Sequence, residues 1–375
     1  MIDGEGWGRL GAVSPVVEVR DLTVRFGAVT ALEGFDLTAP AGTSVALVGR
    51  NGAGKSTTLR VLAGVLPPTA GTVRVAGVDA VRDPGTAKTR VGYCPDVGGL
   101  IPRATPWEHL QLAATLRSLA PGWERRALDL LDRFDLGDVT DRVTASFSHG
   151  MGRRMSVLLA AFHSPDVLLL DEPFSSLDTP TRAALLTDLG AILRADRTTT
   201  VLVTHERGEA LALADRVAVL MDGRLRQVDE TARVFYAPVS EEVARFVGVE
   251  TLVSGRVVRS DGGVTAVDAD GRIVEVAAAA MPGAMVRLAI RPEDVTLEPA
   301  GAATYPSSAR NAFDGVVVRI AASTHAMHGI VDVGFPLVAA VTARSVRELG
   351  LAPGARVCAV FTASAAHLIT EGRSA

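Results

Sequence analysis

The octapeptide Gly49-Arg50-Asn51-Gly52-Ala53-Gly54-Lys55-Ser56 constrains this chain more than any other feature. Its glycines, lysine and serine have the spacing of a phosphate-binding loop. An apolar run at 45–48 precedes it and a helical stretch follows from Thr57, as such a loop requires. Backbone N–H groups of this kind of turn converge on phosphate oxygens, which the glycines allow the main chain to approach. The sequence therefore predicts a triphosphate site.

The lysine of this loop is one of only two in the chain, Lys55 and Lys88, among 38 basic residues. A glycine-rich turn with a chance surface lysine is therefore the less favoured alternative. We expect Lys55 to neutralise charge on the β- and γ-phosphates and the Ser56 hydroxyl to bind Mg²⁺. The residues expected to contact phosphate are Gly49, Asn51, Gly52, Ala53, Gly54, Lys55, Ser56 and Thr57.

Two further apolar runs end in polar residues: 167–170 is followed by Asp171 and Glu172, and 199–203 leads to His205. Continuous apolar runs separated by helical segments predict buried parallel strands, whose ligands lie beyond the carboxyl ends. We expect Asp171 to hold Mg²⁺, Glu172 to polarise the water that attacks the γ-phosphate, and His205 to contact that phosphate. The alternatives are two solvated acids and a structural histidine.

The composition narrows the class of protein. The 375 residues are 48% hydrophobic and 21% charged, which is typical of globular domains. A net charge of −4 argues against a dedicated nucleic-acid binder, and two cysteines exclude a disulfide framework. We find no uncharged apolar stretch of about 18 residues and no secretory signal, so a membrane-spanning helix is not expected and the cytosol is the default compartment.

The character of the sequence changes along the chain. Residues 1–15 are expected to form a flexible leader, and 16–248 an α/β domain. From 249 to 375 short alternating runs rich in valine and glycine predict an all-β domain. Within it, 255–259 resembles 315–319, which predicts two tandem β-units, about 251–298 and 308–370.

Residues 16–248 resemble the nucleotide-binding domain of ABC transporters. The motifs that carry the resemblance are the phosphate-binding loop, Ser148-His149-Gly150-Met151 as the signature loop, Asp171-Glu172-Pro173, Ser175-Ser176-Leu177-Asp178 as the D-loop, and Thr204-His205-Glu206 with the switch histidine. The resemblance implies an α/β P-loop ATPase fold with a helical subdomain at about 97–165. It also implies that Phe26 stacks on adenine, the alternative being a phenylalanine of the core.

The same resemblance implies a mechanism. Two copies of the chain sandwich two ATP molecules with Mg²⁺, and Ser148, His149, Gly150 and Met151 of one copy face the phosphates held by the other. Ser176 and Asp178 belong to the D-loop between the sites. ATP then acts as a ligand of the closed state, and the closure drives membrane permease subunits. An extracytoplasmic binding protein would be an indirect partner, no nucleic acid is expected, and the cytoplasmic face of the membrane is the expected location. The segment 97–114 is expected to contact the permease, with Trp107 and Leu110 as candidates and a core role as the alternative.

Two positions depart from the family. Asp96 stands where the family usually has glutamine; it can still bind Mg²⁺ through water, but it adds negative charge beside the phosphates. In the signature loop, His149 and Met151 replace glycine and glutamine. At both positions the residues of this chain are similar to those of exporter-type ATPases.

The C-terminal region resembles the transport-associated OB-fold of importer ATPases in the segments Ile290–Val295 and Ser308–Asn311. The segment Val338–Thr342 is similar to the molybdate-binding variety of that domain. The resemblance implies an OB-like tandem domain that holds oxyanions at subunit contacts, with Ser308, Arg310 and Asn311 as candidate ligands. A purely structural dimerisation module is the alternative.

The sequence therefore predicts the ATPase subunit of an importer, most simply for molybdate or tungstate. The alternatives are an exporter ATPase, an importer of spermidine or putrescine, iron or sulfate, and an ABC ATPase without a transport role. The last would carry duplicated nucleotide domains or DNA-handling inserts, and this chain has one phosphate-binding loop.

Overall fold

The computed structural model of the protein describes residues 15–301, 308–322 and 327–370. The leader expected over 1–15 lies, apart from Pro15, outside the described residues. Contacts divide the chain into two compact units, Met1–Thr231 and Ala232–Ala375. This division falls earlier in the chain than the change of sequence character at 248–249.

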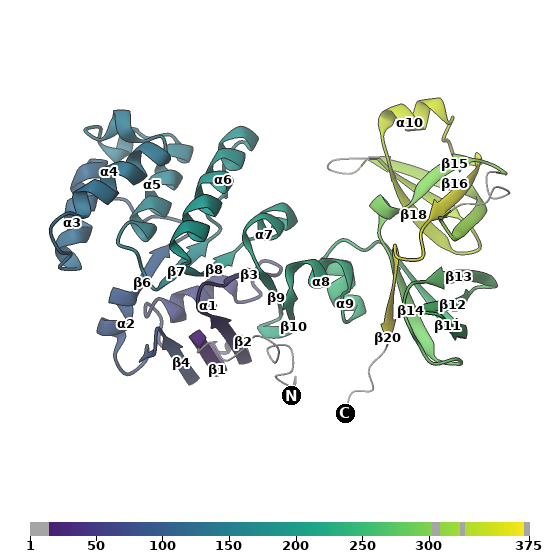
Figure 1. Ribbon diagram of the computed structural model, residues 1–375, viewed down its shortest axis with the longest axis horizontal. Helices are drawn as coiled ribbons and strands as arrows, with labels where there is room; N and C mark the ends of the chain where they lie inside the picture. Colours follow the sequence, from purple (N-terminus) through teal and green to yellow (C-terminus); the bar gives the residue numbers. More distant parts are fainter. Residues whose placement is uncertain (1–14, 302–307, 323–326, 371–375) are drawn as a thin grey trace. The chain divides into compact units, whose positions relative to one another are not determined.

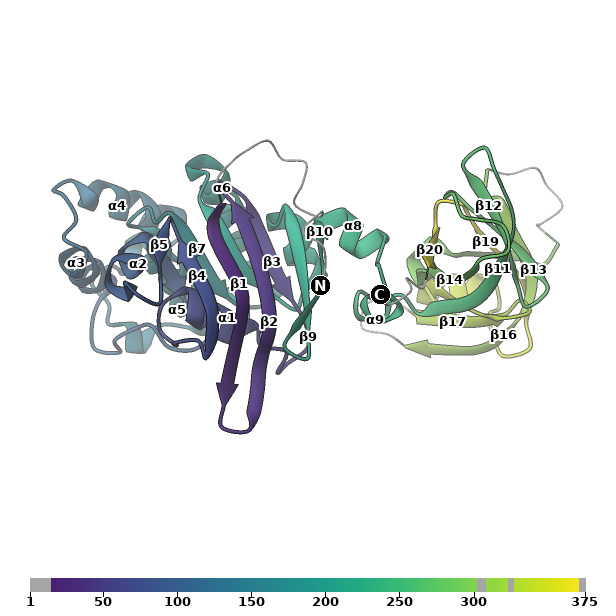
Figure 2. The same cartoon turned by 90° about the horizontal axis from the view of Figure 1, so that it is seen from below.

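The first unit contains two sheets (Figure 1). The larger has the order β10-β9-β3-β8-β7-β6, and its strands are parallel except for β10, which pairs antiparallel with β9. The smaller is antiparallel with the order β2-β1-β4-β5, and Figure 2 shows β1 and β2 as its long hairpin. The strands are β1 (Pro15–Phe26), β2 (Val29–Pro40), β3 (Ser44–Val48), β4 (Ala70–Val75), β5 (Val78–Asp79), β6 (Val91–Cys94), β7 (Val167–Asp171), β8 (Thr199–Val203), β9 (Arg216–Met221) and β10 (Arg224–Glu230).

The centre of the larger sheet confirms the expectation of parallel strands buried on both faces. Every residue of β3, β7, β8 and β9 is buried. Apolar side chains on both faces of these strands leave no solvated side, so helices must cover them. Because β3, β7 and β8 are neighbours and parallel, their carboxyl ends meet at one edge of the sheet. The predicted phosphate and carboxylate motifs all follow these ends.

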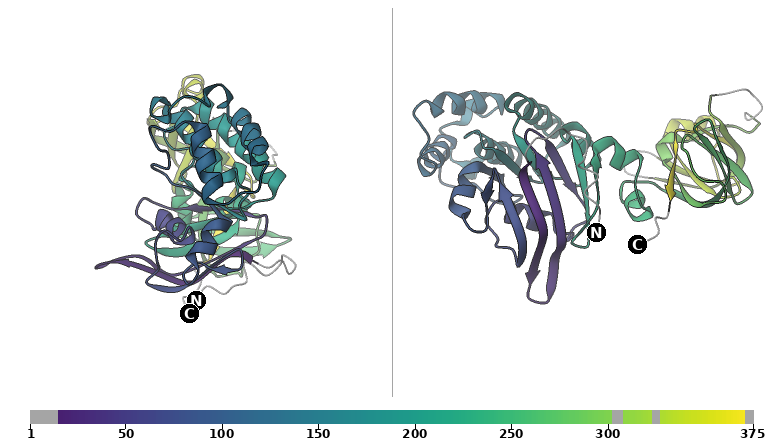
Figure 3. Two further views of the ribbon diagram at one scale, coloured as in Figure 1. Left: turned by 90° about the vertical axis from the view of Figure 1, so that its left-hand side faces the viewer. Right: turned by 60° about the horizontal axis from the view of Figure 1, so that its bottom comes forward.

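The helices of this unit form two groups. Those that alternate with the strands are α1 (Lys55–Leu62), α2 (Pro84–Arg90), α6 (Thr179–Asp196) and α7 (Arg207–Leu213). The helical subdomain contains α3 (Pro106–Leu116), α4 (Trp123–Arg133) and α5 (His149–Ala161), with two short 3₁₀ turns at Gly137–Val139 and Thr144–Ser146. Figure 3 shows these blue and teal helices gathered away from the purple β1–β2 hairpin.

Aromatic packing holds the helical subdomain together. The ring of Trp107 in α3 lies 5.6 Å from that of Trp123 in α4, and Trp123 meets Phe162 at 6.3 Å between ring centroids. Thr105 caps α3 reciprocally with Glu108, which defines the start of that helix. Leu110 has no exposed surface. The expectation that Leu110 contacts a permease is therefore wrong, because its side chain is buried in the core.

The second unit is all-β apart from short helices. Its two five-stranded antiparallel sheets have the orders β13-β12-β11-β14-β20 and β15-β19-β16-β17-β18. The strands are β11 (Thr251–Asp261), β12 (Val264–Ala269), β13 (Arg272–Val276), β14 (Met285–Ile290), β15 (Thr296–Pro299), β16 (Asn311–Ala322), β17 (Met327–Asp332), β18 (Pro336–Val341), β19 (Arg356–Phe361) and β20 (Ala366–Thr370). The helices are α8 (Thr231–Tyr236), which begins at the division between the units, α9 (Glu241–Phe246), α10 (Ala343–Glu348) and a 3₁₀ turn at Pro292–Asp294.

The structure carries the internal repeat that the sequence predicted. The pairing of β11 with β12 shifts register between Val257 and Arg259, and that of β16 with β17 shifts between Val317 and Arg319. Such shifts mark β-bulges, which bend a strand at a defined position. The two halves therefore share strand order and bulge.

The halves also exchange strands. β15 follows β14 of the first half but pairs with β19 of the second, and β20 follows β19 but pairs with β14. Phe313 of β16 packs against Phe335 and Phe361, with ring centroids 6.2 and 5.9 Å away. One continuous apolar core thus serves both sheets.

Candidate functional site

The phosphate-binding loop is held against the sheet by glycines. A Cβ at Gly49 would lie 2.2 Å from the carbonyl oxygen of Leu220, so no other residue fits there. Gly54 has φ +104° and a Cβ there would lie 2.6 Å from the carbonyl oxygen of Ala31. This left-handed conformation is open to glycine at little cost, and it starts α1 at Lys55. The loop therefore turns from β3 into α1 within contact of its neighbours.

Lys55 is buried inside this loop, with 6% of its surface exposed. Its Nζ donates to the carbonyl oxygens of Gly49 at 2.8 Å and Arg50 at 3.0 Å. Burial lowers the pKa of Lys55, while the nearby carboxylates of Glu172 and Asp171 act to raise it. The alternative of a surface lysine is wrong, because this ammonium group is enclosed by the loop.

Ser56 and Asp171 bring the loop and strand β7 together. Ser56 Oγ donates to Oδ1 of Asp171 at 3.0 Å, and only 1% of Asp171 is exposed. Burial raises the pKa of Asp171; the Ser56 hydroxyl opposes this, and Asp96 and Glu172 add to it. Arg60 also opposes the rise, but burial prevails. Burying a carboxylate costs free energy, and a bound cation would relieve that cost.

Asp96 follows β6 and lines the same cleft of about 280 Å³ as Ser56 and Asp171. The three oxygen donors predicted for Mg²⁺ therefore open onto one space. No group of three His, Cys, Asp or Glu side chains within the described ranges could hold a metal by itself. Mg²⁺ is commonly held by one or two carboxylates together with waters and substrate phosphates, so this sparse set fits it.

Glu172 and His205 meet beyond the ends of β7 and β8. His205 Nδ1 lies 3.5 Å from Oε2 of Glu172, and the N–H of Glu172 donates to the carbonyl oxygen of Val203 at 3.1 Å. Glu172 has φ +46°, which is uncommon for a residue with a side chain. The parallel pairing of the two strands thus brings together two side chains that are 33 residues apart in the sequence.

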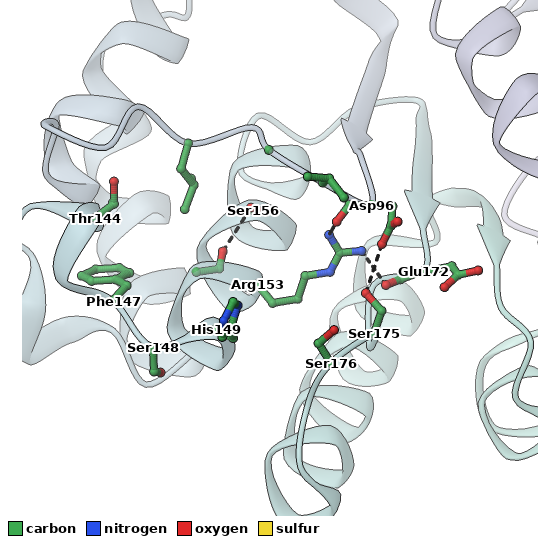
Figure 4. A pocket seen from close by; sticks show the side chains of 14 residues that line it. Asp96, Thr144, Phe147, Ser148, His149, Arg153, Ser156, Glu172, Ser175 and Ser176 are labelled. Carbon is green, nitrogen blue, oxygen red and sulfur yellow. Dashed lines mark hydrogen bonds between the residues drawn. The ribbon is translucent and has the colours of Figure 1, made fainter.

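Residues of the signature loop and of the D-loop line a second cleft, of about 650 Å³, that Glu172 also lines (Figure 4). Ser148 caps α5, its Oγ accepting from the Met151 N–H at 3.2 Å. Gly150 lies close to α6: a Cβ there would sit 3.3 Å from Thr181 Cγ2. Other predicted residues lining this cleft are Asp96, His149 and Ser176.

Asp178 and Phe26 have clear local roles. Asp178 caps α6 by accepting from the Thr181 N–H at 2.8 Å, which lowers the pKa of Asp178. Phe26 ends β1 with half of its surface exposed. A core role for Phe26 is therefore wrong, and its exposed ring leaves the predicted stacking on adenine open.

Sequence reasoning missed Arg153, a buried arginine of α5. Its guanidinium reaches the main chain beside Asp96 and Glu172 (Figure 4). Arg154 follows directly, so the sequence holds no local signal that distinguishes the two arginines. The orientation of α5 about its axis decides which of the two arginines is buried.

The candidate anion ligands of the second unit separate in the structure. Asn311 is buried, and its amide group accepts from the N–H of Glu275 and donates to the Glu275 carbonyl, each at 2.8 Å. It thereby links β16 to β13, and both ends of its amide are used. Ser308 and Arg310 are exposed.

Membrane-spanning helices can be assessed for the described ranges. No helix among residues 15–301, 308–322 and 327–370 has both the length and the hydropathy to cross a bilayer.

Comparisons with known proteins agree with this geometry. The family model for ABC transporters matches residues 32–175, and that for the TOBE domain matches 307–368. A sulfate/thiosulfate import ATP-binding protein of Chromobacterium violaceum is 35% identical over 77% of this chain and 78% of its own. A molybdate/tungstate import ATP-binding protein of Pyrococcus horikoshii is 32% identical over 86% and 91%. A ferric-ion import ATP-binding protein of Brucella abortus is 34% identical over 80% and 85%.

Solved structures match more than half of the chain. The ATP-binding subunit of an ABC transporter is 31% identical, with a TM-score of 0.55 over 58% of this chain and 91% of that one. A dimeric ATP-binding cassette in a post-hydrolysis state with ADP and Pi is 25% identical, with a TM-score of 0.53 over 57% and 98%. Together with the site geometry, these likenesses show that the chain belongs to the ABC transporter family, among the import ATPases that bind ATP and carry a TOBE domain.

Proposed function

We propose that this protein energises the uptake of an oxyanion, molybdate or tungstate, by hydrolysing ATP between two copies of the chain. The observation that carries the ATPase part is the meeting of Lys55, the Ser56–Asp171 pair and the Glu172–His205 pair at one edge of the larger sheet. A site that combines a phosphate cradle, oxygen donors for a cation and a carboxylate beside a histidine is suited to phosphoryl transfer to water.

In this proposal the first unit binds Mg-ATP through its loop. The N–H groups of 49–57 and the ammonium of Lys55 hold the phosphates, and Phe26 stacks on the adenine ring. Ser56, Asp171 and Asp96 would hold Mg²⁺, which neutralises charge on the β- and γ-phosphates when bound. Release of Lys55 from two carbonyl oxygens to the phosphates replaces neutral acceptors with charged ones, which strengthens the hydrogen bonds.

Glu172 is the proposed general base. Its carboxylate accepts a hydrogen bond from the attacking water, and His205, 3.5 Å away, orients that carboxylate or contacts the γ-phosphate. The unusual φ of Glu172 and its bond to Val203 hold the side chain at the strand end. The lining of one cleft by Glu172 and the signature loop supports a site that closes around the nucleotide.

The second copy completes the site in this proposal. Ser148, His149, Gly150 and Met151 of one copy would contact the γ-phosphate bound by the other, with Ser176 and Asp178 between the two sites. Ser148 is suited to this, because it caps a helix whose free N–H groups attract anions. Dimeric structures of a related cassette support the pairing.

Permease docking is assigned to 97–114, with the membrane's cytoplasmic face as the location and an extracytoplasmic binding protein as the indirect partner. Exposed apolar side chains support this: 84% of Val97 is exposed, and Ile101 and Leu112 are about half exposed. Trp107 is half-buried against Trp123 and contributes less surface.

The choice of solute is drawn from the named relatives and from the second unit. Relatives named for sulfate, molybdate/tungstate and ferric ions have similar identities, and the molybdate/tungstate relative is matched over the largest share. Ser308 and Arg310 remain the candidate anion ligands, since they are exposed and Asn311 is used within the fold. An exporter is less favoured, because the named relatives are import proteins, although Asp96 and the altered signature are unusual.

One experiment tests both parts. Full-length Glu172→Gln protein is incubated with Mg-ATP and its mass is followed by light scattering; the same sample is then titrated calorimetrically with molybdate, tungstate and sulfate. We expect a nucleotide-dependent dimer that binds molybdate or tungstate more tightly than sulfate. Failure to dimerise would overturn the ATP sandwich. Dimers that bind none of the anions, or that prefer sulfate, would overturn the molybdate assignment alone.

A further inference from the structure

We propose that Arg153 is a positioning residue that couples the two ATP sites of the dimer. It connects the hydrolytic carboxylate of one site to the signature loop that serves the other. The inference rests on the proposed ATP sandwich and extends it to a residue outside all the sequence motifs.

The contacts of Arg153 are unusually complete. A guanidinium group has five N–H donors. Arg153 makes five hydrogen bonds, and all of them go to main-chain carbonyl oxygens. Nε donates to Pro173 at 3.0 Å, one terminal nitrogen donates to Pro95 at 2.6 Å and Asp96 at 3.0 Å, and the other donates to Asp171 and Glu172. Only 8% of Arg153 is exposed. Breaking this arrangement would leave several buried carbonyl groups unpaired.

These carbonyl groups belong to the two segments that carry the catalytic carboxylates. Pro95 and Asp96 follow β6, whereas Asp171 is the last residue of β7 and 172–173 follow it. Arg153 fixes the distance between them, while Ser175 Oγ donates to Oδ1 of Asp96 at 3.1 Å across the same gap. A shift of the Asp96 loop therefore moves Glu172 through a single side chain.

The third element joined by Arg153 is α5, the helix on which it stands. Ser148 caps this helix, five residues and about 7.5 Å along the axis from Arg153. A helix transmits displacement along its length with little deformation, because backbone hydrogen bonds join each turn to the next. The guanidinium therefore sets where the signature loop lies relative to Glu172 of the same chain. In the sandwich these two groups act on different nucleotides, so Arg153 couples the sites.

The neighbouring arginines do not share this role. Arg154 donates to the carbonyl oxygen of Phe134 and pairs with the carboxylate of Asp135 at 3.2 Å. Arg126 reaches the other end of α5, donating to the Phe162 carbonyl at 2.8 Å. Arg126 is therefore a matched control: it anchors the same helix without touching the site.

Mixed dimers separate coupling from a local effect. One copy is wild type; its partner carries Glu172→Gln, so only the site built on the wild-type Glu172 turns over. The partner's signature loop serves that active site. Differently tagged copies are mixed with Mg-ATP, the mixed dimer is isolated, and turnover is compared for partners with and without an added Arg153→Lys change. Lysine keeps the charge but loses the planar set of donors.

We expect Arg153→Lys in the partner to lower turnover at the intact site by about tenfold, because misplacement of a distant positioning group carries penalties of this kind. Arg126→Lys in the partner should leave turnover within about twofold of the reference; thermal unfolding of each protein measures how much either change perturbs folding. Equal turnover with and without Arg153→Lys would overturn the inference. If Arg153→Lys does not fold, Arg153→Gln takes its place. If Glu172→Gln forms no dimer with Mg-ATP, the proposed sandwich itself falls.

Discussion

Ser56 Oγ and Asp171 Oδ1 lie 3.0 Å apart, joining the first turn of α1 to the end of β7. The hydroxyl is the only donor that compensates this buried carboxylate through a side-chain hydrogen bond among the described contacts. In the family role proposed for them, both oxygens bind the same cation, so their contact is the arrangement that nucleotide and Mg²⁺ would replace.

Asp171→Asn should stabilise the nucleotide-free protein. Because burial raises the pKa of Asp171, the folded protein binds this proton more tightly than the unfolded chain. The stability contributed by this group is complete below its ordinary value of 3.8 and is lost as the pH rises through the raised pKa. At neutral pH the negative charge of Asp171 therefore destabilises the folded protein. We expect Tm to rise by about 2–4 °C in metal-free buffer, with loss of Mg-dependent ATPase activity. An unchanged or lower Tm would contradict this electrostatic reading.

Glu172→Gln should separate binding from hydrolysis. Glutamine keeps the size of the side chain but cannot take a proton from water. We expect Mg-ATP affinity within about threefold of wild type and turnover reduced by roughly 10²–10⁴-fold. Steady-state hydrolysis and fluorescent-nucleotide titration measure the two. Turnover near the wild-type rate would remove Glu172 from its proposed role.

Lys55→Ala should lose nucleotide affinity, and Lys88→Ala supplies its control. Lys55 is buried in the loop, whereas Lys88 in α2 is exposed, and the chain has no other lysine. We expect at least a tenfold weaker affinity for Mg-ATP in Lys55→Ala, consistent with the loss of a charge-assisted contact of about 1.5–3 kcal/mol. Lys88→Ala should bind like wild type. Equal binding by both variants would count against the loop as the phosphate site.

Asp96→Gln tests the acidic departure from the family. Glutamine can still accept from Ser175 Oγ, which now bonds Asp96 at 3.1 Å, but it removes a negative charge that helps to raise the pKa of Asp171. The pKa of Asp171 should therefore fall, and the acid limb of the pH–rate profile should move to lower pH. We also expect turnover at neutral pH to rise by about two- to fivefold, since less negative charge faces the phosphates. Identical pH–rate profiles would show that the departure is neutral.

Asn311→Ala should destabilise the second unit. The substitution removes both hydrogen bonds that the buried Asn311 amide makes to the part-buried N–H and carbonyl groups of Glu275, which costs up to about 1–3 kcal/mol for each group. Thermal unfolding of the full chain should show a lower Tm with ATPase activity retained at 25 °C. A normal Tm combined with lost anion binding would instead return Asn311 to the list of anion ligands.

Much of the site was predictable because its signals are local. The loop 49–56, the pair 171–172 and His205 each stand directly after an apolar run, and parallel strands bring such ends together. The α/β fold and the all-β region followed from the same runs. The helical stretch around Trp107 was also visible, but whether Leu110 faced outward was not, since packing against other helices decides that.

The unpredicted features are all non-local. Arg153 and Arg154 are adjacent and chemically identical, and only the orientation of α5 makes one of them bond five carbonyl oxygens. The use of Asn311 on Glu275 depends on two strands from different sheets. The internal repeat was visible as similar residues, whereas the exchange of β15 and β20 depends on pairings that span 61 and 80 residues and leave no trace in the local pattern.

The exchange of β15 and β20 links the unfolding of the two halves of the C-terminal region. β15 completes the second sheet and β20 completes the first. Each sheet therefore contains one strand that comes from the other half of the sequence. Melting one half strips an edge strand from the other, so the region should unfold in a single cooperative step. A premature stop codon anywhere before Ala366 would remove β20 and expose the edge of β14. An unpaired strand edge of this kind can pair with another chain and so promote aggregation.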